Sequence, residues 1–376
     1  MQYPEDELIG IIRDAGVDFT ASLPCEKIKV LLEKVGQQFF HVPLTREEEG
    51  VGICAGAALA GKKPAMFVQS SGIGNMINAL LSLTQFYQLP LTLFVSQRGI
   101  YKEKIAAQLP MGQRLPKILK GAGIGYSIIS TAADFAAVSR NLKSVYKKNR
   151  IHAFLLSPEI WEGSSACSTA TFDQRPISCQ VQQQKRAFLK PECTRYELIE
   201  AIVPQLEGRV VVSNLGWPSK ELYALKHQPS NFYMLGSMGM VSPIGLGISL
   251  SSEKEVVVID GDGSLLMNPG VLATAAHMSP DNLTIIAIDN SSYGSTGSQK
   301  TLTGSCVDLE LVARGLGIGN TVKTATRQQL IMALGTKGTG VKFIHALALP
   351  GNRDVANIPL DRLQIRDMAK AHLLSE

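Results

Sequence analysis

The chain has 376 residues, of which 45% are hydrophobic and 18% are charged. This length is enough for two domains with complete hydrophobic cores, and the composition excludes general disorder. The formal net charge of +5 comes from Lys and Arg residues that are scattered along the sequence. Because there is no basic run, nucleic acid is a poor candidate partner.

The sequence predicts no membrane span, because the longest apolar candidate, residues 234–250, is interrupted by polar residues, a proline and glycines. The polar, acidic start differs from a secretion signal, so we expect a cytoplasmic protein with no membrane partner. Six cysteines show neither Cys-x-x-Cys spacing nor close pairing with histidines, namely Cys25, Cys54, Cys167, Cys179, Cys193 and Cys306. We therefore expect reduced thiols rather than a zinc site or disulfides.

Helix-like and strand-like segments alternate along the chain. Apolar residues recur at helical spacing in 8–15 and 199–206, and short apolar runs of strand length occupy 65–69, 91–96, 152–156, 210–213, 256–259, 283–288 and 343–349. The alternation predicts an α/β fold with two doubly wound, mostly parallel sheets. It lapses between residues 161 and 193, where Ser, Thr and Gln predominate. We interpret 166–192 as a linker between a first domain, 1–165, and a second domain, 193–376.

The second half contains a candidate metal and phosphate site. One predicted strand ends in Gly261-Asp262-Gly263, a segment of helical length begins near Ser264, and the next strand ends before Asn290. Side chains that follow parallel strands lie at one edge of a sheet, so Asp262 and Asn290 can share a ligand. Carboxylate, amide and phosphate oxygens suit Mg²⁺, and the glycines allow a phosphate to approach the backbone. By itself, Gly-Asp-Gly more often marks an ordinary tight turn, but the predicted strands on both sides favour the metal site here.

The same stretch resembles the signature of thiamine-diphosphate-dependent enzymes, in which an Asp and an Asn hold the Mg²⁺ that anchors the cofactor diphosphate. The resemblance implies that Asp262 and Asn290 are metal ligands, together with the backbone carbonyl of Ser292. Family members usually have two consecutive Asn residues where this chain has Asp289-Asn290, so only the second position matches.

Two further segments are similar to those of the family. Residues 235–240 resemble the segment that binds the aminopyrimidine, which implies a role for the Gly236 carbonyl and the Met238 side chain; alone, they also fit a glycine-rich lead-in to a helix. Residues 45–56 resemble the segment with the activating glutamate, which implies that Glu47 is the catalytic carboxyl group. Its neighbours Glu48 and Glu49 are expected to lie in a solvated first helical turn.

The resemblance covers nearly the whole chain and implies a pyrimidine-binding domain followed by a diphosphate-binding domain. This short form is shared by two groups of carbon–carbon lyases, the sulfopyruvate and phosphonopyruvate decarboxylases. Residues 97–119 favour the first group, with its two subunits fused in one chain. The implied reaction converts 3-sulfopyruvate to sulfoacetaldehyde and CO₂, a step of coenzyme M biosynthesis, and phosphonopyruvate decarboxylation is the alternative. The family also implies a homodimer or larger homo-oligomer with the cofactor between subunits.

A small 2-oxo acid with an acidic tail calls for cationic side chains. Arg98 and Lys102 are candidates, although each also fits a solvated surface charge. Gly72 and Asn75 follow a predicted strand and are expected to line the substrate pocket. No residue is assigned to return a proton after CO₂ leaves.

Two other functional classes are alternatives for a chain with this alternating pattern. A nicotinamide-dependent dehydrogenase is disfavoured because no Gly-x-Gly-x-x-Gly opens a strand–helix–strand unit. A non-catalytic module that binds the same cofactor remains open.

Overall fold

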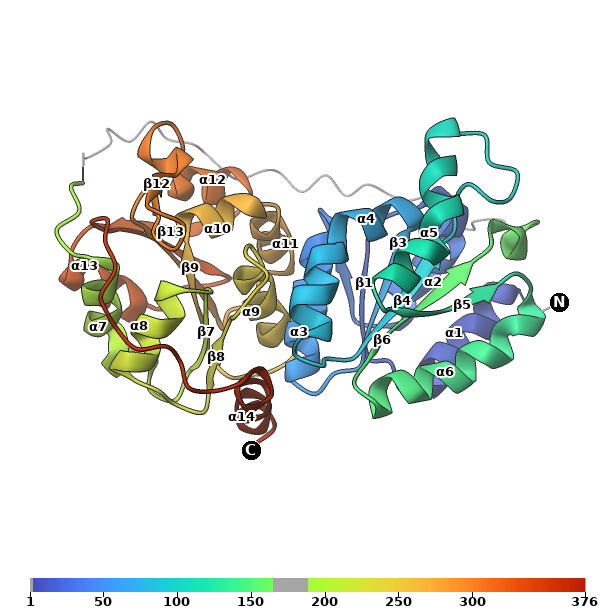
Figure 1. The fold of residues 1–376 in the computed structure, drawn as a ribbon, viewed down its shortest axis with the longest axis horizontal. Helices are drawn as coiled ribbons and strands as arrows, with labels where there is room; N and C mark the ends of the chain where they lie inside the picture. The colour runs from blue at the N-terminus through green and yellow to red at the C-terminus, as the bar shows by residue number, and fades with distance from the viewer. Residues whose placement is uncertain (1–2, 165–188, 376) are drawn as a thin grey trace. The chain divides into compact units, whose positions relative to one another are not determined.

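The computed structural model describes residues 3–164 and 189–375, and the chain divides into two compact units, 1–174 and 175–376 (Figure 1). Most of the predicted linker lies outside the described residues, so its bounds stay a prediction. In the described part of the chain, no helix is long and apolar enough to cross a bilayer. The four cysteines described there form no disulfide: Cys25, Cys54, Cys193 and Cys306.

The first unit contains a six-stranded sheet in which every pair of neighbouring strands is parallel. The spatial order is β2-β1-β3-β4-β6-β5. The central strands are buried along their whole length, which explains their continuous apolar sequences. The strands are β1 (Phe19–Ser22), β2 (His41–Pro43), β3 (Pro64–Gln69), β4 (Leu91–Ser96), β5 (Gly125–Ile129) and β6 (Ile151–Leu156).

Helices cover both faces of this sheet, with α1, α2 and α6 on one side and α3, α4 and α5 on the other (Figure 1). α1 begins with a proline and three acidic residues and ends near Arg13, an arrangement that suits the helix dipole. α3 is rich in small residues and buried on nearly all sides. The helices are α1 (Pro4–Asp14), α2 (Lys29–Gln38), α3 (Glu47–Leu59), α4 (Ser70–Ala79), α5 (Leu109–Gly121) and α6 (Phe135–Lys147).

The second unit has its own six-stranded parallel sheet, ordered β13-β14-β10-β9-β7-β8, and a separate two-stranded hairpin, β11-β12. The strands are β7 (Val210–Ser213), β8 (Asn231–Tyr233), β9 (Val256–Gly261), β10 (Leu283–Asp289), β11 (Ser292–Tyr293), β12 (Gln299–Lys300), β13 (Asn320–Thr324) and β14 (Lys342–Leu347).

Helices α7, α8 and α13 lie on one face of this sheet, and α9 lies on the other (Figure 1). Thr194 and Glu197 form a reciprocal capping box at the start of α7, which satisfies backbone N–H groups that the helix leaves free. The helices are α7 (Arg195–Leu206), α8 (Trp217–Leu225), α9 (Val241–Ser249), α10 (Asp262–Met267), α11 (Val271–Met278), α12 (Leu309–Gly315), α13 (Arg327–Gly335) and α14 (Arg362–Leu374).

The predicted fold class is confirmed: each unit is a doubly wound parallel sheet. All seven predicted strands are present, with ends that differ by at most two residues, and both predicted helices are confirmed as α1 and α7. The sequence did not reveal edge strands such as β5 and β13, because their residues are mostly half-buried or exposed and carry no continuous apolar run.

Candidate active site

A cavity of about 120 Å³ lies where several strands of the second sheet end. β7 and β9 are neighbours, and the chain proceeds from them toward opposite edges of the sheet. Such a reversal point is where open α/β sheets bind ligands. The cavity is lined by seven of the predicted site residues: Met238, Gly261, Asp262, Gly263, Ser264, Asn290 and Ser292.

Asp262 is buried at the start of α10, directly after β9. Its Oδ2 atom accepts hydrogen bonds from the hydroxyls of Thr301, at 2.5 Å, and Thr303, at 3.0 Å. Burial raises the pKa of Asp262; the hydrogen bond from Thr301 opposes this rise, and the charge of Asp289 adds to it. A neighbouring cation would favour the ionised carboxylate, as expected for a metal ligand.

Asn290 is buried immediately after β10. Its Oδ1 atom accepts a hydrogen bond from the backbone N–H of Ser292 at 3.2 Å. Its Nδ2 atom is buried and has no hydrogen-bond partner among the described residues. A buried donor without a partner is costly, so this amide is suited to an acceptor on a bound ligand, such as a phosphate oxygen.

Asp289, which departs from the usual family pattern, belongs to a buried network beside the cavity. Its Oδ1 accepts from the Thr303 hydroxyl at 2.7 Å, and its Oδ2 lies 2.9 Å from Nε2 of His345. Nδ1 of His345 lies 3.6 Å from Asp308. Burial opposes ionisation of Asp289, but the hydrogen bonds from His345 and Thr303 outweigh it and lower the pKa of Asp289.

The predicted pyrimidine-binding segment is linked to the same cavity. The backbone N–H of Gly239 donates to the Ser264 hydroxyl at 3.1 Å. Gly239 has a φ of +87°, a value that glycine adopts without strain. Met238 lines the cavity with Asp262, whereas Gly236 is half-buried and is not among the residues that line it. The structure thus brings Met238 into the site and leaves the role of Gly236 a prediction.

Several residues of this site were missed in the sequence. Asn214 and Leu215 follow the buried strand β7 and line the cavity, so their position after a strand was an available signal. Tyr293 packs so closely on Gly263 that a Cβ atom there would lie 2.2 Å from Cε1 of the ring. The Tyr293 ring therefore requires glycine at position 263.

In the first unit, the structure brings together three predicted site residues. Glu47 is 4% exposed at the first turn of α3. Nδ2 of Asn75 donates to its Oε2 at 2.9 Å. A Cβ atom on Gly72 would lie 2.7 Å from both Cγ and Oε1 of Glu47. Position 72 must therefore lack a side chain for Glu47 to keep its place.

The prediction for the neighbouring glutamates was wrong in part. Glu49 is fully buried rather than solvated, and its Oε1 accepts a hydrogen bond from the backbone N–H of Thr45 at 2.6 Å. It therefore stabilises the chain that enters α3. Glu48 is half-buried, with its Oε2 3.5 Å from Nε of Arg46.

Both candidate cations for the acidic tail are paired with carboxylates. Arg98 is buried and makes two hydrogen bonds to Glu103, at 2.7 and 2.8 Å. Lys102 is exposed and pairs with Glu162. Lys102 also lines a cavity of about 380 Å³ in the first unit, together with Lys27, Lys29 and Lys104. Their role in substrate binding remains a prediction.

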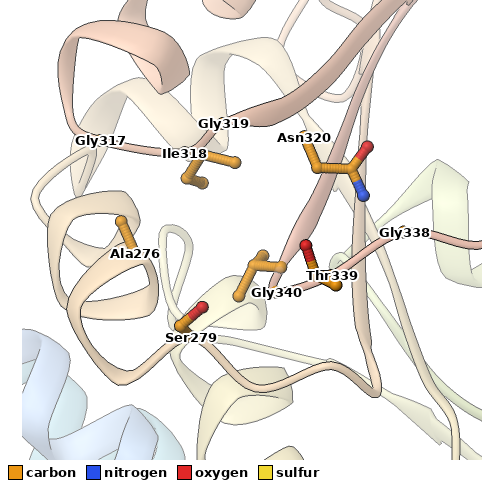
Figure 2. A pocket seen from close by; sticks show the side chains of 10 residues that line it. Ala276, Ser279, Gly317, Ile318, Gly319, Asn320, Gly338, Thr339 and Gly340 are labelled. Carbon is orange, nitrogen blue, oxygen red and sulfur yellow. The ribbon is translucent and has the colours of Figure 1, made fainter. Parts of the chain in front are cut away.

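A cavity of about 360 Å³ in the second unit is shown in Figure 2. Ala276, Ser279, Asn320 and Thr339 are among the residues that line it, together with several glycines. It lies at the amino ends of β13 and β14, whereas Asp262 follows the carboxyl end of β9. None of the predicted site residues lines this cavity.

The residues at the carboxyl edge of the second sheet fit a diphosphate and a hard metal ion. Asp262 supplies a carboxylate, Asn290 supplies an amide oxygen, and the Asn290 N–H group lacks a partner among the described residues. This combination provides oxygen ligands for the ion and a donor for the phosphate.

Parts of both units match models of a known protein family. Residues 5–117 match the N-terminal TPP binding domain of thiamine pyrophosphate enzymes, and residues 216–346 match the C-terminal TPP binding domain. The chain is similar to the 4-hydroxybenzoylformate decarboxylase of Rhodococcus jostii RHA1, with a TM-score of 0.70, 14% identity and coverage of 93% of this chain and 99% of that chain. This likeness confirms the fold.

Proteins found by sequence comparison share a higher identity with this chain than that solved structure does. A sulfopyruvate decarboxylase of Methanosarcina acetivorans is 45% identical over 95% of this chain and 94% of its own length. The β subunit of the Methanothermobacter thermautotrophicus enzyme is 49% identical over 46% of this chain and 90% of its own length, and α subunits match another part of the chain. A Streptomyces viridochromogenes phosphonopyruvate decarboxylase is 31% identical over 93% of this chain and 89% of its own length. The chain therefore belongs to the thiamine pyrophosphate enzymes, within the family of the sulfopyruvate decarboxylases.

Proposed function

We propose that this chain decarboxylates 3-sulfopyruvate to sulfoacetaldehyde and CO₂, with thiamine diphosphate and Mg²⁺ as cofactors. The observation that carries the proposal is the 45% identity to a sulfopyruvate decarboxylase along nearly the whole chain. Phosphonopyruvate decarboxylases also align with nearly the whole chain, but at 30–31% identity. The reaction would supply an aldehyde for coenzyme M biosynthesis.

The residues of the second unit would bind the diphosphate end of the cofactor. Asp262 and Asn290 would provide oxygen ligands to Mg²⁺ together with the carbonyl of Ser292, and Met238 would support the pyrimidine. When bound, the cofactor would supply a nucleophilic carbon for the ketone and a cationic ring to accept the electron pair of the bond that breaks as CO₂ leaves. The protein supplies orientation and a largely dry setting, since Asp262 and Asn290 are at most 4% exposed.

Glu47 would exchange a proton with the pyrimidine ring of the cofactor. Its burial removes competing water, and the amide of Asn75 fixes the Oε2 atom. The oxygen Oε1 is left to meet the ring nitrogen. A glutamine at this position would keep the shape but could not exchange the proton in the same way.

The acidic tail of the substrate would bind near cationic side chains of the first unit. Lys102 and its neighbouring lysines line one cavity, which supports a role for that surface. Arg98 is already engaged by a carboxylate, because its guanidinium group forms a bidentate contact with Glu103. Lys102 is also paired, with Glu162, but that pair is exposed whereas Arg98 and Glu103 are buried, so Lys102 is the more accessible candidate of the two.

We further propose a homodimer or larger assembly in which the cofactor lies between subunits. Glu47 and Asp262 belong to different compact units, and separate α and β subunits of relatives match different parts of this chain. Light scattering of the purified protein, with and without cofactor, would measure the size of the assembly. A monomer that is fully active would contradict this part of the proposal.

A parallel decarboxylation assay with sulfopyruvate, phosphonopyruvate and pyruvate tests the substrate. We expect the highest kcat/KM with sulfopyruvate and a requirement for both thiamine diphosphate and Mg²⁺. A preference for phosphonopyruvate would change the substrate but not the reaction class. Cofactor binding without consumption of any of the three acids would instead favour a non-catalytic module.

A further inference from the structure

We propose that Thr301 and Thr303 are positioning residues for the metal site: they hold Oδ2 of Asp262, so that Oδ1 is the oxygen presented to the ion. The inference rests on the proposed function, in which Asp262 binds Mg²⁺. It adds two residues that neither the motif nor its spacing identifies.

The first observation is that two hydroxyls converge on one oxygen. The Oγ1 atoms of Thr301 and Thr303 lie 2.5 and 3.0 Å from Oδ2 of Asp262, and 2.9 Å from each other. An ionised carboxylate has about two lone-pair sites on each oxygen; at Oδ2 the Thr301 hydroxyl occupies one, and the Thr303 hydroxyl is within reach of the other. Oδ1 receives neither hydroxyl, and this asymmetry fixes which oxygen is available to a cation.

The second observation is that the two threonines are tied to the other predicted ligands. The backbone N–H of Thr301 donates to the carbonyl of Ser291 at 3.1 Å, and Ser291 lies between Asn290 and Ser292. The β11-β12 hairpin pairs Ser292 with Lys300 and so brings Thr301 back to this point. A hydroxyl on Thr301 therefore sets the position of Asp262 relative to the segment that carries the remaining ligands.

The third observation is that Thr303 is shared between two carboxylates. Its single hydroxyl proton can go to Oδ2 of Asp262 or to Oδ1 of Asp289, which is 2.7 Å away. The contact between Oδ2 of Asp289 and His345 keeps the Asp289 carboxylate in place, so its Oδ1 competes with Asp262 for the Thr303 proton. Thr301 has no such second carboxylate among the contacts of the described residues. We therefore expect Thr301 to hold Asp262 more firmly than Thr303 does.

The test is a titration of the full-length protein with Mn²⁺ in the presence of thiamine diphosphate, followed by electron paramagnetic resonance. Thr301→Val should weaken Mn²⁺ binding about tenfold, and Thr303→Val should weaken it by a smaller factor, because a hydrogen bond to a charged group is lost. Thr301→Ser should restore the affinity to within a few fold. At saturating Mn²⁺, kcat of Thr301→Val should return to the wild-type value, since only positioning is impaired.

Thr324→Val is the matched control. Thr324 is a buried threonine in the same unit whose hydroxyl has no hydrogen-bond partner among the described residues. The control should bind Mn²⁺ as the wild type does, which separates a local effect from a general response to threonine removal.

Asp262→Ala distinguishes failure of this inference from failure of the proposed metal site. If Asp262→Ala binds Mn²⁺ normally, the metal site itself is wrong. If Asp262→Ala loses Mn²⁺ but Thr301→Val binds it as the wild type does, the positioning role is wrong. Hydrogen exchange of the Thr301 backbone amide gives a readout that needs no metal, and it should be faster in Asp262→Ala. Unchanged exchange would contradict the proposed hydrogen bond between Thr301 and Asp262 as a positioning contact.

Discussion

Asn75 on α4 donates its side-chain N–H to Oε2 of Glu47 at the first turn of α3, at a distance of 2.9 Å. This contact fixes Oε2 of Glu47, whereas Oε1 accepts no hydrogen bond from the described residues. It also explains why a buried glutamate is tolerated at the start of a helix that is otherwise lined by small and apolar residues.

The first prediction concerns the charge of Glu47. Glu47→Gln should lower kcat by about 10²- to 10⁴-fold, because the amide cannot exchange a proton as the carboxyl does. Isothermal titration should show thiamine diphosphate affinity within a few fold of the wild type. Glu48→Gln is the control and should leave kcat unchanged, since Glu48 lies on the half-buried side of the same turn. Full activity of Glu47→Gln would exclude the catalytic assignment.

The second prediction uses two glycines of α4. Gly72→Ala places a methyl group 2.7 Å from Glu47, so the carboxyl must move; a displacement of about 1 Å can cost about 10²-fold in rate. Gly74→Ala is a matched change in the same helix, where the nearest atom is Met111 Cε at 3.6 Å, an ordinary contact. Steady-state kinetics should show a large loss only for Gly72→Ala. Equal activity of the two variants would mean that the position of Glu47 is not critical.

The third prediction concerns cofactor retention. Asp262→Ala should abolish the Mg²⁺-dependent retention of thiamine diphosphate on gel filtration, because the ion loses its carboxylate ligand. Asp354→Ala removes an exposed carboxyl group of the same unit and should retain the cofactor as the wild type does. Removal of Mg²⁺ with a chelator should reproduce the Asp262→Ala result in the wild-type protein. Retention by Asp262→Ala would show that the diphosphate is bound without this ligand.

The fourth prediction links pH to stability through Glu103. The hydrogen bonds from Arg98 lower the pKa of Glu103 to about 2, from 4.5. A carboxyl whose pKa is depressed by folding stabilises the protein above its unfolded pKa, and this contribution is lost as the pH falls from about 4.5 toward 2. Chemical denaturation should therefore show a large gap in unfolding free energy between wild type and Glu103→Gln at pH 7, and a small gap near pH 2.

The control for this prediction is the exposed pair of Lys102 and Glu162. Glu162→Gln should change the unfolding free energy little at any pH, because solvent-exposed ion pairs contribute little to stability. A Glu103→Gln effect as small as this, or one that does not depend on pH, would contradict a stabilising role for the ion pair with Arg98.

The sequence predicted the parts of the fold that are buried and continuous. β4 and β9 are apolar runs flanked by recognisable turns, so their positions could be read from the order of residues. β8 has three residues, and β13 is half-buried along most of its length, so neither has a pattern that separates it from a loop. Edge strands such as these are specified by neighbours that the sequence does not display.

The candidate site shows the same division. Asp262 and Asn290 could be predicted as site residues because they directly follow buried strands. Glu47 was predicted only from the resemblance to a known family. Thr303 contacts Asp262, 41 positions away, and His345 contacts Asp289, 56 positions away, so neither contact can be predicted from neighbouring residues in the sequence. Glu49 was wrongly predicted to be exposed, because the prediction considered only its negative charge. The backbone N–H of Thr45, to which its carboxylate is bound, cannot be identified from the sequence. Long-range hydrogen bonds of this kind require coordinates.

The amide of Asn290 has a consequence for the life of the protein in the cell. A buried N–H group without a partner costs about 1–3 kcal/mol, and Nδ2 of Asn290 has none among the described residues. Loading with the vitamin-derived cofactor would remove that penalty and add binding free energy of its own. Enzyme abundance should therefore follow thiamine supply even at constant synthesis, since starved cells would hold a form that opens and is degraded more readily.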